Sequence, residues 1–216
     1  YAEAHYNLGI AYKAAKKNEK AIASFKKAIA INADYAKAYN NLGNIYRMVT
    51  TNKEAIAAYK QVIKIDPDYA PAYNNLGAAY ASANRNTEAE TLFKKAIEID
   101  PNYAEAYHNL GVVYKALDDH QGAMISFKKA IEIKADYPKA HNNLGNAYRA
   151  ANKREEAIAS YKKAIKIDPG YAPAYDNLAA VYIQEKQFKL AVGYCDRANE
   201  MGLTNVAHLE TLKPYR

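Results

Sequence analysis

Asparagine recurs at one fixed spacing along the whole sequence, and its side chain is the most regular source of chemistry in the chain. An amide offers both a hydrogen-bond donor and an acceptor, so it can match the N–H and C=O groups of one peptide unit. A row of such amides is suited to holding the backbone of an extended polypeptide. The residues, spaced by 34, are Asn7, Asn41, Asn75, Asn109, Asn143 and Asn177, here called the asparagine ladder.

The residue types that usually carry catalysis or bind metals have no comparable order. The five histidines share no spacing that would gather metal ligands or a catalytic base. The single Cys195 excludes an internal disulfide framework and a cysteine metal cluster. The sequence also has no glycine-rich phosphate loop and no metal-ligand motif. We therefore expect no enzymatic activity, no metal and no cofactor.

The elements that position the ladder belong to a sequence repeat. A Leu-Gly pair recurs every 34 residues from Leu8-Gly9 to Leu144-Gly145, and Leu178-Ala179 is the last copy. We count positions within a repeat from its first residue, so that the ladder is position 6. The repeats span 2–35, 36–69, 70–103, 104–137, 138–171 and 172–205.

Each repeat is predicted to form two helices. Apolar residues at positions 4, 7, 8 and 11, and again at 20, 21, 24, 27 and 28, follow helical spacing. Residues 50–52 exemplify the polar turn between the helices, and Asn18, Asn52 and Asn86 are predicted to cap the second helix. Small residues at positions 8 and 20 allow close approach, and large rings at 4, 11 and 24 fill the remaining space.

These positions resemble the tetratricopeptide-repeat family along nearly the whole chain. The shared residues include tyrosine at position 11, alanine at position 20 and proline at position 32 of several repeats. The resemblance implies an all-α, right-handed superhelical solenoid whose concave groove is lined mainly by first helices. Stacked repeats need an atypical terminal unit, so we expect residues 206–212 to form a capping helix through Leu209 and Leu212. Residues 213–216 are expected to run into solvent.

The family geometry places the asparagine ladder on the concave groove. It is similar to the ladder in the superhelix of O-linked N-acetylglucosamine transferases, which holds the backbones of substrate peptides. The resemblance covers only the repeats, because nothing in the sequence resembles a catalytic domain. The alternative role for these amides is a hydrogen bond to a neighbouring helix.

The groove is predicted to be basic on balance. Glu3, Glu105 and Asp176 oppose a larger number of cations, and two further asparagines stand at position 9. The predicted peptide-binding residues beyond the ladder are Lys13, Lys37, Arg47, Lys115, Lys139, Arg149, Asn44 and Asn146. An acidic peptide segment of a partner protein is the ligand that fits this pattern. The net charge of +7 also favours an acidic partner.

Two other classes of function stay open. A second basic row at positions 25 and 26 should face outward and could bind an anionic surface. Helical arrays can also form homo-oligomers by stacking through their terminal repeats. The sequence argues against a nucleic-acid partner, because its tyrosines occupy core positions instead of alternating with the exposed lysines. No apolar run is long enough to span a membrane.

The repeats also match in groups of three, which indicates duplication of a three-repeat block. Repeats 2 and 5 share Asn-Asn-Leu-Gly-Asn at 40–44 and 142–146. Tyr1 stands where other repeats have their final tyrosine, so we expect these residues to be part of a longer chain. The sequence assigns no cellular compartment.

Overall fold

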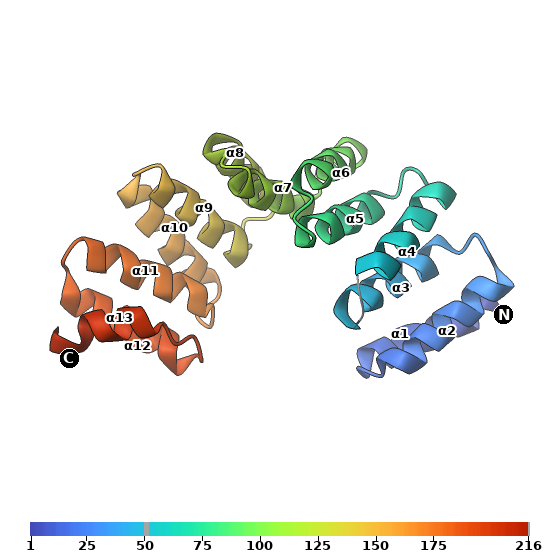
Figure 1. Ribbon diagram of the computed structural model, residues 1–216, viewed down its shortest axis with the longest axis horizontal. Coiled ribbons are helices and arrows are strands. Elements are labelled where there is room, and N and C mark those ends of the chain that lie inside the picture. Colours follow the sequence, from blue (N-terminus) through green and yellow to red (C-terminus); the bar gives the residue numbers. More distant parts are fainter. Residues whose placement is uncertain (50–51, 216) are drawn as a thin grey trace. The chain divides into compact units, whose positions relative to one another are not determined.

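A computed structural model describes residues 1–49 and 52–215, and these residues form thirteen α-helices and one short 3-10 helix. The structure confirms the all-α fold of paired helices (Figure 1). The helices of repeats 1–3 are α1 Ala2–Ala14, α2 Asn18–Ile31, α3 Ala36–Val49, α4 Asn52–Ile65, α5 Ala70–Ser82 and α6 Asn86–Ile99. Those that follow are α7 Ala104–Ala116, α8 His120–Ile133, α9 Pro138–Ala150, α10 Arg154–Ile167, α11 Ala172–Gln184, α12 Phe188–Glu200 and α13 Val206–Leu212.

The chain divides into two compact halves, Tyr1–Val113 and Tyr114–Arg216. In the N-terminal half, each first helix packs on its own second helix, as α1 does on α2, and α2 and α4 also pack on the next first helices, α3 and α5. The C-terminal half has the same order from α8 to α12. A helix pair cannot bury its apolar face alone, so stacking of neighbours builds the core of each half.

Helices within a pair approach closely because position 8 lacks a side chain. A Cβ atom on Gly9 would lie 2.6 Å from the Phe25 ring, and one on Gly145 would lie 2.5 Å from the Tyr161 ring. Such distances are far shorter than a normal van der Waals contact. The last repeat has Ala179 at this position, and its aromatic ring is replaced by the smaller, buried Cys195. The predicted role of small residues is therefore confirmed.

The predicted asparagine caps are wrong. Helices α2 and α6 include Asn18 and Asn86 as their first residues, and their N-caps, Lys17 and Arg85, accept no hydrogen bond through their side chains. The chain reverses through a residue with positive φ at position 15, as at Lys16 with φ 57°, and enters the helix before the asparagine is reached. Asn52 instead donates to Ser82 Oγ at 3.0 Å. Residues 50 and 51 of the predicted turn lie outside the described residues.

The connection between repeats is closed by a side chain that the sequence analysis did not single out. Position 31 accepts a hydrogen bond from the backbone N–H two residues later, at 3.0 Å for Asp100 and 3.0 Å for Asp168. This local bond favours a turn over continued helix. Together with Pro101 and Pro169, it ends the second helix at Ile99 and Ile167.

Helix α13 covers the core at the C-terminal end, as predicted. Leu212 is completely buried and Leu209 packs on the same cluster. His208 and Asn205 bind the Asp176 carboxylate, with distances of 2.7 Å from Nδ1 and 3.2 Å from Nδ2. Residues Lys213–Tyr215 are exposed, as expected, but they form a 3-10 helix and the Tyr215 ring stacks on Phe188 at 3.9 Å. Stacking on the apolar ring of Phe188 is more favourable for the Tyr215 ring than contact with water.

Within residues 1–49 and 52–215, none of the helices combines the length and apolarity that crossing a membrane requires.

Candidate functional site

The asparagine ladder joins successive repeats through its side-chain N–H groups. Asn75 Nδ2 donates to Asn40 Oδ1 at 3.0 Å, and Asn177 Nδ2 donates to Asn142 Oδ1 at 2.9 Å. Asn109 donates in the same way to Asn74, at 2.9 Å. In each case position 6 binds position 5 of the preceding repeat. The alternative role for these amides, a hydrogen bond to a neighbouring helix, is therefore present at these positions.

Part of the amide remains for a ligand at Asn75 and Asn177, whereas Asn41 uses its carbonyl and its NH2 group within the protein. A side-chain amide has two N–H donors and one carbonyl acceptor, and the bond to the preceding repeat uses one donor. Asn75 and Asn177 are half-buried, while Asn7 is exposed on α1. Asn41 donates to Tyr6 Oη at 3.3 Å and its Oδ1 accepts from Lys13 Nζ at 2.9 Å. The structure thus brings together two of the predicted site residues, Lys13 and Asn41.

The asparagines at position 9 are held by tyrosines of the second helices. The Tyr59 hydroxyl donates to Asn44 Oδ1 at 2.7 Å, and the Tyr161 hydroxyl donates to Asn146 Oδ1 at 2.8 Å. Burial raises the pKa of Tyr59 to about 12, against a smaller opposing effect of the Arg47 charge. Burial likewise raises the pKa of Tyr161 to about 12. The two asparagines were predicted near the groove from the repeat pattern, but their tyrosine partners were not.

A polar hollow of about 810 Å³ lies on the C-terminal half. It brings together four predicted site residues, Lys115, Asn146, Arg149 and Asn177. The other residues that line it are Asp118, His120, Ala150, Asn152, Ala180, Gln184 and His208. The lining includes two permanent cations and several side-chain amides but a single carboxylate, so the hollow is suited to an anionic group. His208 belongs to the capping helix, whose part in the site the sequence analysis did not foresee.

Other predicted residues lie away from this hollow. Lys37 and Lys139 are exposed in the first turns of α3 and α9. Arg47 is exposed near the end of α3, in the N-terminal half. Asn143 is half-buried on α9 and is not among the described residues that line the hollow. The predicted set is therefore only partly assembled at one place.

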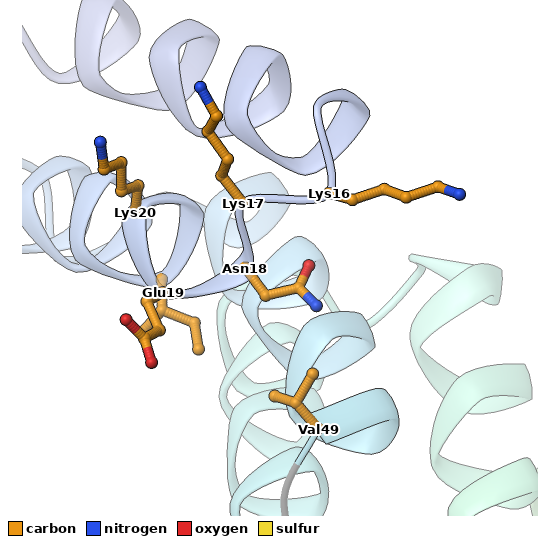
Figure 2. Close-up of a pocket in the computed structure, with 7 residues that line it drawn as sticks. Lys16, Lys17, Asn18, Glu19, Lys20 and Val49 are labelled. Carbon is orange, nitrogen blue, oxygen red and sulfur yellow. The ribbon is translucent and has the colours of Figure 1, made fainter.

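A second hollow, of about 640 Å³, lies where α1 turns into α2. It is lined by three lysines, but Figure 2 shows Lys16 pointing away from Lys17 and Lys20. Glu19 extends to the opposite side of the helix from Lys17 and Lys20 (Figure 2). Because the charged ends do not converge, this hollow is a weak candidate for an anion site.

The second basic row lies on the second helices and is largely exposed to solvent. Its residues are exposed apart from the half-buried Lys95. Several form ion pairs within their own helix, with Lys94 at 2.7 Å from Glu90 and Lys129 at 2.7 Å from Glu132. These pairs offset part of the charge of the row. The row comprises Lys26, Lys27, Lys60, Lys94, Lys95, Lys128, Lys129, Lys162, Lys163 and Arg197.

The thiol and imidazoles lie in structural surroundings. Cys195 is buried in the core of the last repeat. His141 is buried, its Nε2 lies 3.0 Å from the Ala135 carbonyl oxygen, and burial lowers its pKa. Among the described residues, no cluster of three or more histidine, cysteine or acidic side chains is arranged to hold a metal ion.

Family models and solved structures match this chain. Models described as tetratricopeptide repeat match residues 34–102, 68–136 and 138–171, and one described as TPR repeat matches residues 12–48. No curated protein matches.

Three solved structures illustrate the likeness. MamA is 28% identical, with 76% of this chain and 96% of that chain covered at a TM-score of 0.66. YrrB, described as a TPR protein with an unusual peptide-binding site, is 25% identical over 88% of this chain and 97% of its own, with a TM-score of 0.66. PilF of Pseudomonas aeruginosa shares the fold, with 18% identity, coverage of 100% and 97%, and a TM-score of 0.86.

Proposed function

Because the chain belongs to the tetratricopeptide-repeat family, we propose that it is a non-catalytic interaction scaffold that binds an extended acidic segment of a partner protein. The segment lies on the first helices. Its acidic side chains bind the cations at position 12, and its backbone binds the amide groups that the asparagine ladder leaves available.

The hollow lined by Lys115, Asn146, Arg149 and Asn177 is the observation that carries this proposal. Ammonium and guanidinium groups only donate hydrogen bonds, and a carboxylate only accepts them. The hollow is open and about 810 Å³ in volume, which is enough for side chains of a peptide but gives no enclosed chamber for chemistry.

The description of YrrB gives independent support. A protein of the same family that is 25% identical to this chain has a peptide-binding site. The net charge of +7 would also attract an acidic segment over long range, an effect that salt weakens.

The test uses peptides selected from a random display library with the whole chain as bait. Binding is measured by fluorescence anisotropy for the wild type and for a charge-reversed variant, Lys115→Glu with Arg149→Glu. The matched control is Lys162→Glu with Lys163→Glu, which makes the same charge change on exposed residues of α10. We expect acidic peptides that lose about tenfold to a hundredfold in affinity with the first variant, since each hydrogen bond to a charged group contributes about 1.5–3 kcal/mol.

The alternatives predict different results. Equal loss in the control would favour an anionic surface bound by the outer lysines. Selection that yields no acidic peptide, together with a mass that rises with protein concentration in light scattering, would favour self-assembly through the terminal repeats.

A further inference from the structure

We propose that Tyr161 and Tyr59 are positioning residues that turn the amides of Asn146 and Asn44 so that their N–H groups face an incoming carboxylate. This inference rests on the proposed function and specifies its ligand chemistry. The chain would carry two equivalent carboxylate sites, one in each half.

The pairing of residue types across the repeats supports this coupling. Position 24 is tyrosine only in repeats 2 and 5, and these two repeats alone have asparagine at position 9. Where position 24 is phenylalanine or cysteine, position 9 is an apolar residue. Those pairs are Phe25 with Ile10, Phe93 with Ala78, Phe127 with Val112 and Cys195 with Ala180. A hydroxyl at one position therefore accompanies an amide at the other.

In the structure, the carbonyl end of the Asn146 amide faces Tyr161. Tyr161 is fully buried, its ring packs against Gly145, and its hydroxyl reaches Asn146 Oδ1 at 2.8 Å. A phenol keeps its proton at neutral pH and can donate it, and burial raises the pKa of Tyr161 further, to about 12. The carbonyl of Asn146 is thus held toward the second helix, which leaves its NH2 group for the hollow.

An outward NH2 group completes a cluster of donors. Lys115 and Arg149 line the same hollow and also only donate. A glutamate side chain presents two acceptor oxygens to such a cluster, whereas a glutamine side chain must bring its own NH2 group toward it. If the amide were free to turn over, its carbonyl oxygen could face the hollow and would repel a carboxylate. The tyrosine therefore favours binding of a carboxylate over binding of a neutral amide.

The N-terminal half has the same set of residues. Tyr59 is fully buried against Gly43 and donates to Asn44 at 2.7 Å, with Arg47 one turn further along α3. Lys13 corresponds to Lys115, because the two are separated by three whole repeats. A partner with two acidic determinants could use both sites, which would raise its apparent affinity above that of either site.

The test is a site-resolved titration by NMR. Two short peptides are added to the whole chain, one in which alanine alternates with glutamate and one in which alanine alternates with glutamine. The side-chain Nε–H resonances of Arg149 and Arg47 report on the two sites separately. In Tyr161→Phe we expect binding of the glutamate peptide to weaken by about tenfold at Arg149 and to stay unchanged at Arg47. Binding of the glutamine peptide should not change at either arginine.

A double-mutant cycle separates positioning from a general structural effect. Asn146→Ala should weaken glutamate binding as Tyr161→Phe does, and adding Tyr161→Phe to Asn146→Ala should cause no further loss. Additive losses, or equal weakening for both peptides, would overturn the positioning role. If Lys115→Glu with Arg149→Glu abolishes binding while Tyr161→Phe leaves it intact, this inference fails and the proposed function stands. Failure of the glutamate peptide to bind the wild type would overturn both.

Discussion

The first and last helix pairs differ in how much of the same apolar face is covered. Leu8 and Leu178 occupy position 7 of their repeats, yet Leu8 is 43% exposed and Leu178 is fully buried. The N-terminal pair has no helix over this face of α1 among the described residues. Leu178 belongs to a core that α10, α12 and α13 complete.

This contrast separates two kinds of contact. Contacts within a helix pair, such as Gly9 against the Phe25 ring, are the same at the open end and in the interior. Contacts between pairs, such as those of the position 7 leucines and the ladder amides, exist only where a neighbour is present. The same residue type should therefore contribute very differently to stability at the two ends.

The largest expected difference is between the two leucines. Leu178→Ala should lower the free energy of unfolding by about 2–5 kcal/mol, because it removes buried atoms and leaves a cavity. Leu8→Ala should cost well under about 1 kcal/mol, because the side chain is already in contact with water. Urea denaturation of both variants measures the difference. Equal costs would show that the open face of α1 is covered in solution.

The ladder amides should differ in the same direction. Asn109→Ala would leave Asn74 Oδ1, which is buried, without its donor, at a cost of about 1–3 kcal/mol. Asn7→Ala removes an exposed side chain and should change stability by less than about 0.5 kcal/mol. Thermal unfolding monitored by circular dichroism would compare them. A similar cost for both variants would mean that the bonds between repeats are not what the ladder contributes.

Substitutions of the position 8 glycines should have similar effects at the open end and in the interior, because their contacts lie within a helix pair. Gly9→Ala and Gly145→Ala should both be destabilising, since overpacking by about 1–3 kcal/mol exceeds the gain of about 0.5–1 kcal/mol from better helix propensity. Gly193→Ala is the control, because a Cβ atom there meets nothing within 4 Å. We expect that control to stabilise the chain slightly in the same urea denaturation experiment. A harmless Gly145→Ala would contradict the close approach of α9 and α10.

The smallest expected effect is a pH dependence in the C-terminal half. Burial, with a smaller effect from Lys163, lowers the pKa of His141 below 6.5, against the opposing bond to the Ala135 carbonyl. A histidine whose folded-state pKa is lowered supports stability above the unfolded pKa, and this stability is lost as the pH falls below about 6.5. His141→Tyr should flatten this acid limb in melting curves, whereas His120→Gln, an exposed site, should not. An unchanged acid limb in His141→Tyr would assign it to other groups.

The helix pairs could be predicted because their signals repeat. Glycine at position 8 and a ring at position 24 each recur through the chain, so one repeat checks another. The helix starts could not be predicted from the asparagines. The chain reverses at position 15 with positive φ, and the residue there is lysine at Lys16 and Lys186 but the more tolerant asparagine or aspartate at Asn84, Asp118 and Asn152.

The candidate site was predicted by residue type but not by bonding. The sequence placed Asn75 and Asn109 on one face, but the bond that each makes to an asparagine 35 residues earlier depends on how the repeats stack and was not predicted. The link between Tyr161 and Asn146 was visible as a paired change across repeats. The docking of His208 on Asp176 was not, because it depends on how α13 packs.

The most direct test of the account is to find where an acidic peptide lies on the chain. A photo-crosslinking amino acid is placed at Ala180, which lines the hollow, or at Ala159, which is exposed on α10 beside the outer lysines. The account predicts that an acidic peptide from the library crosslinks to the Ala180 variant and not to the Ala159 variant. Crosslinking from Ala159 alone would contradict binding in the hollow and would place the ligand on the outer surface.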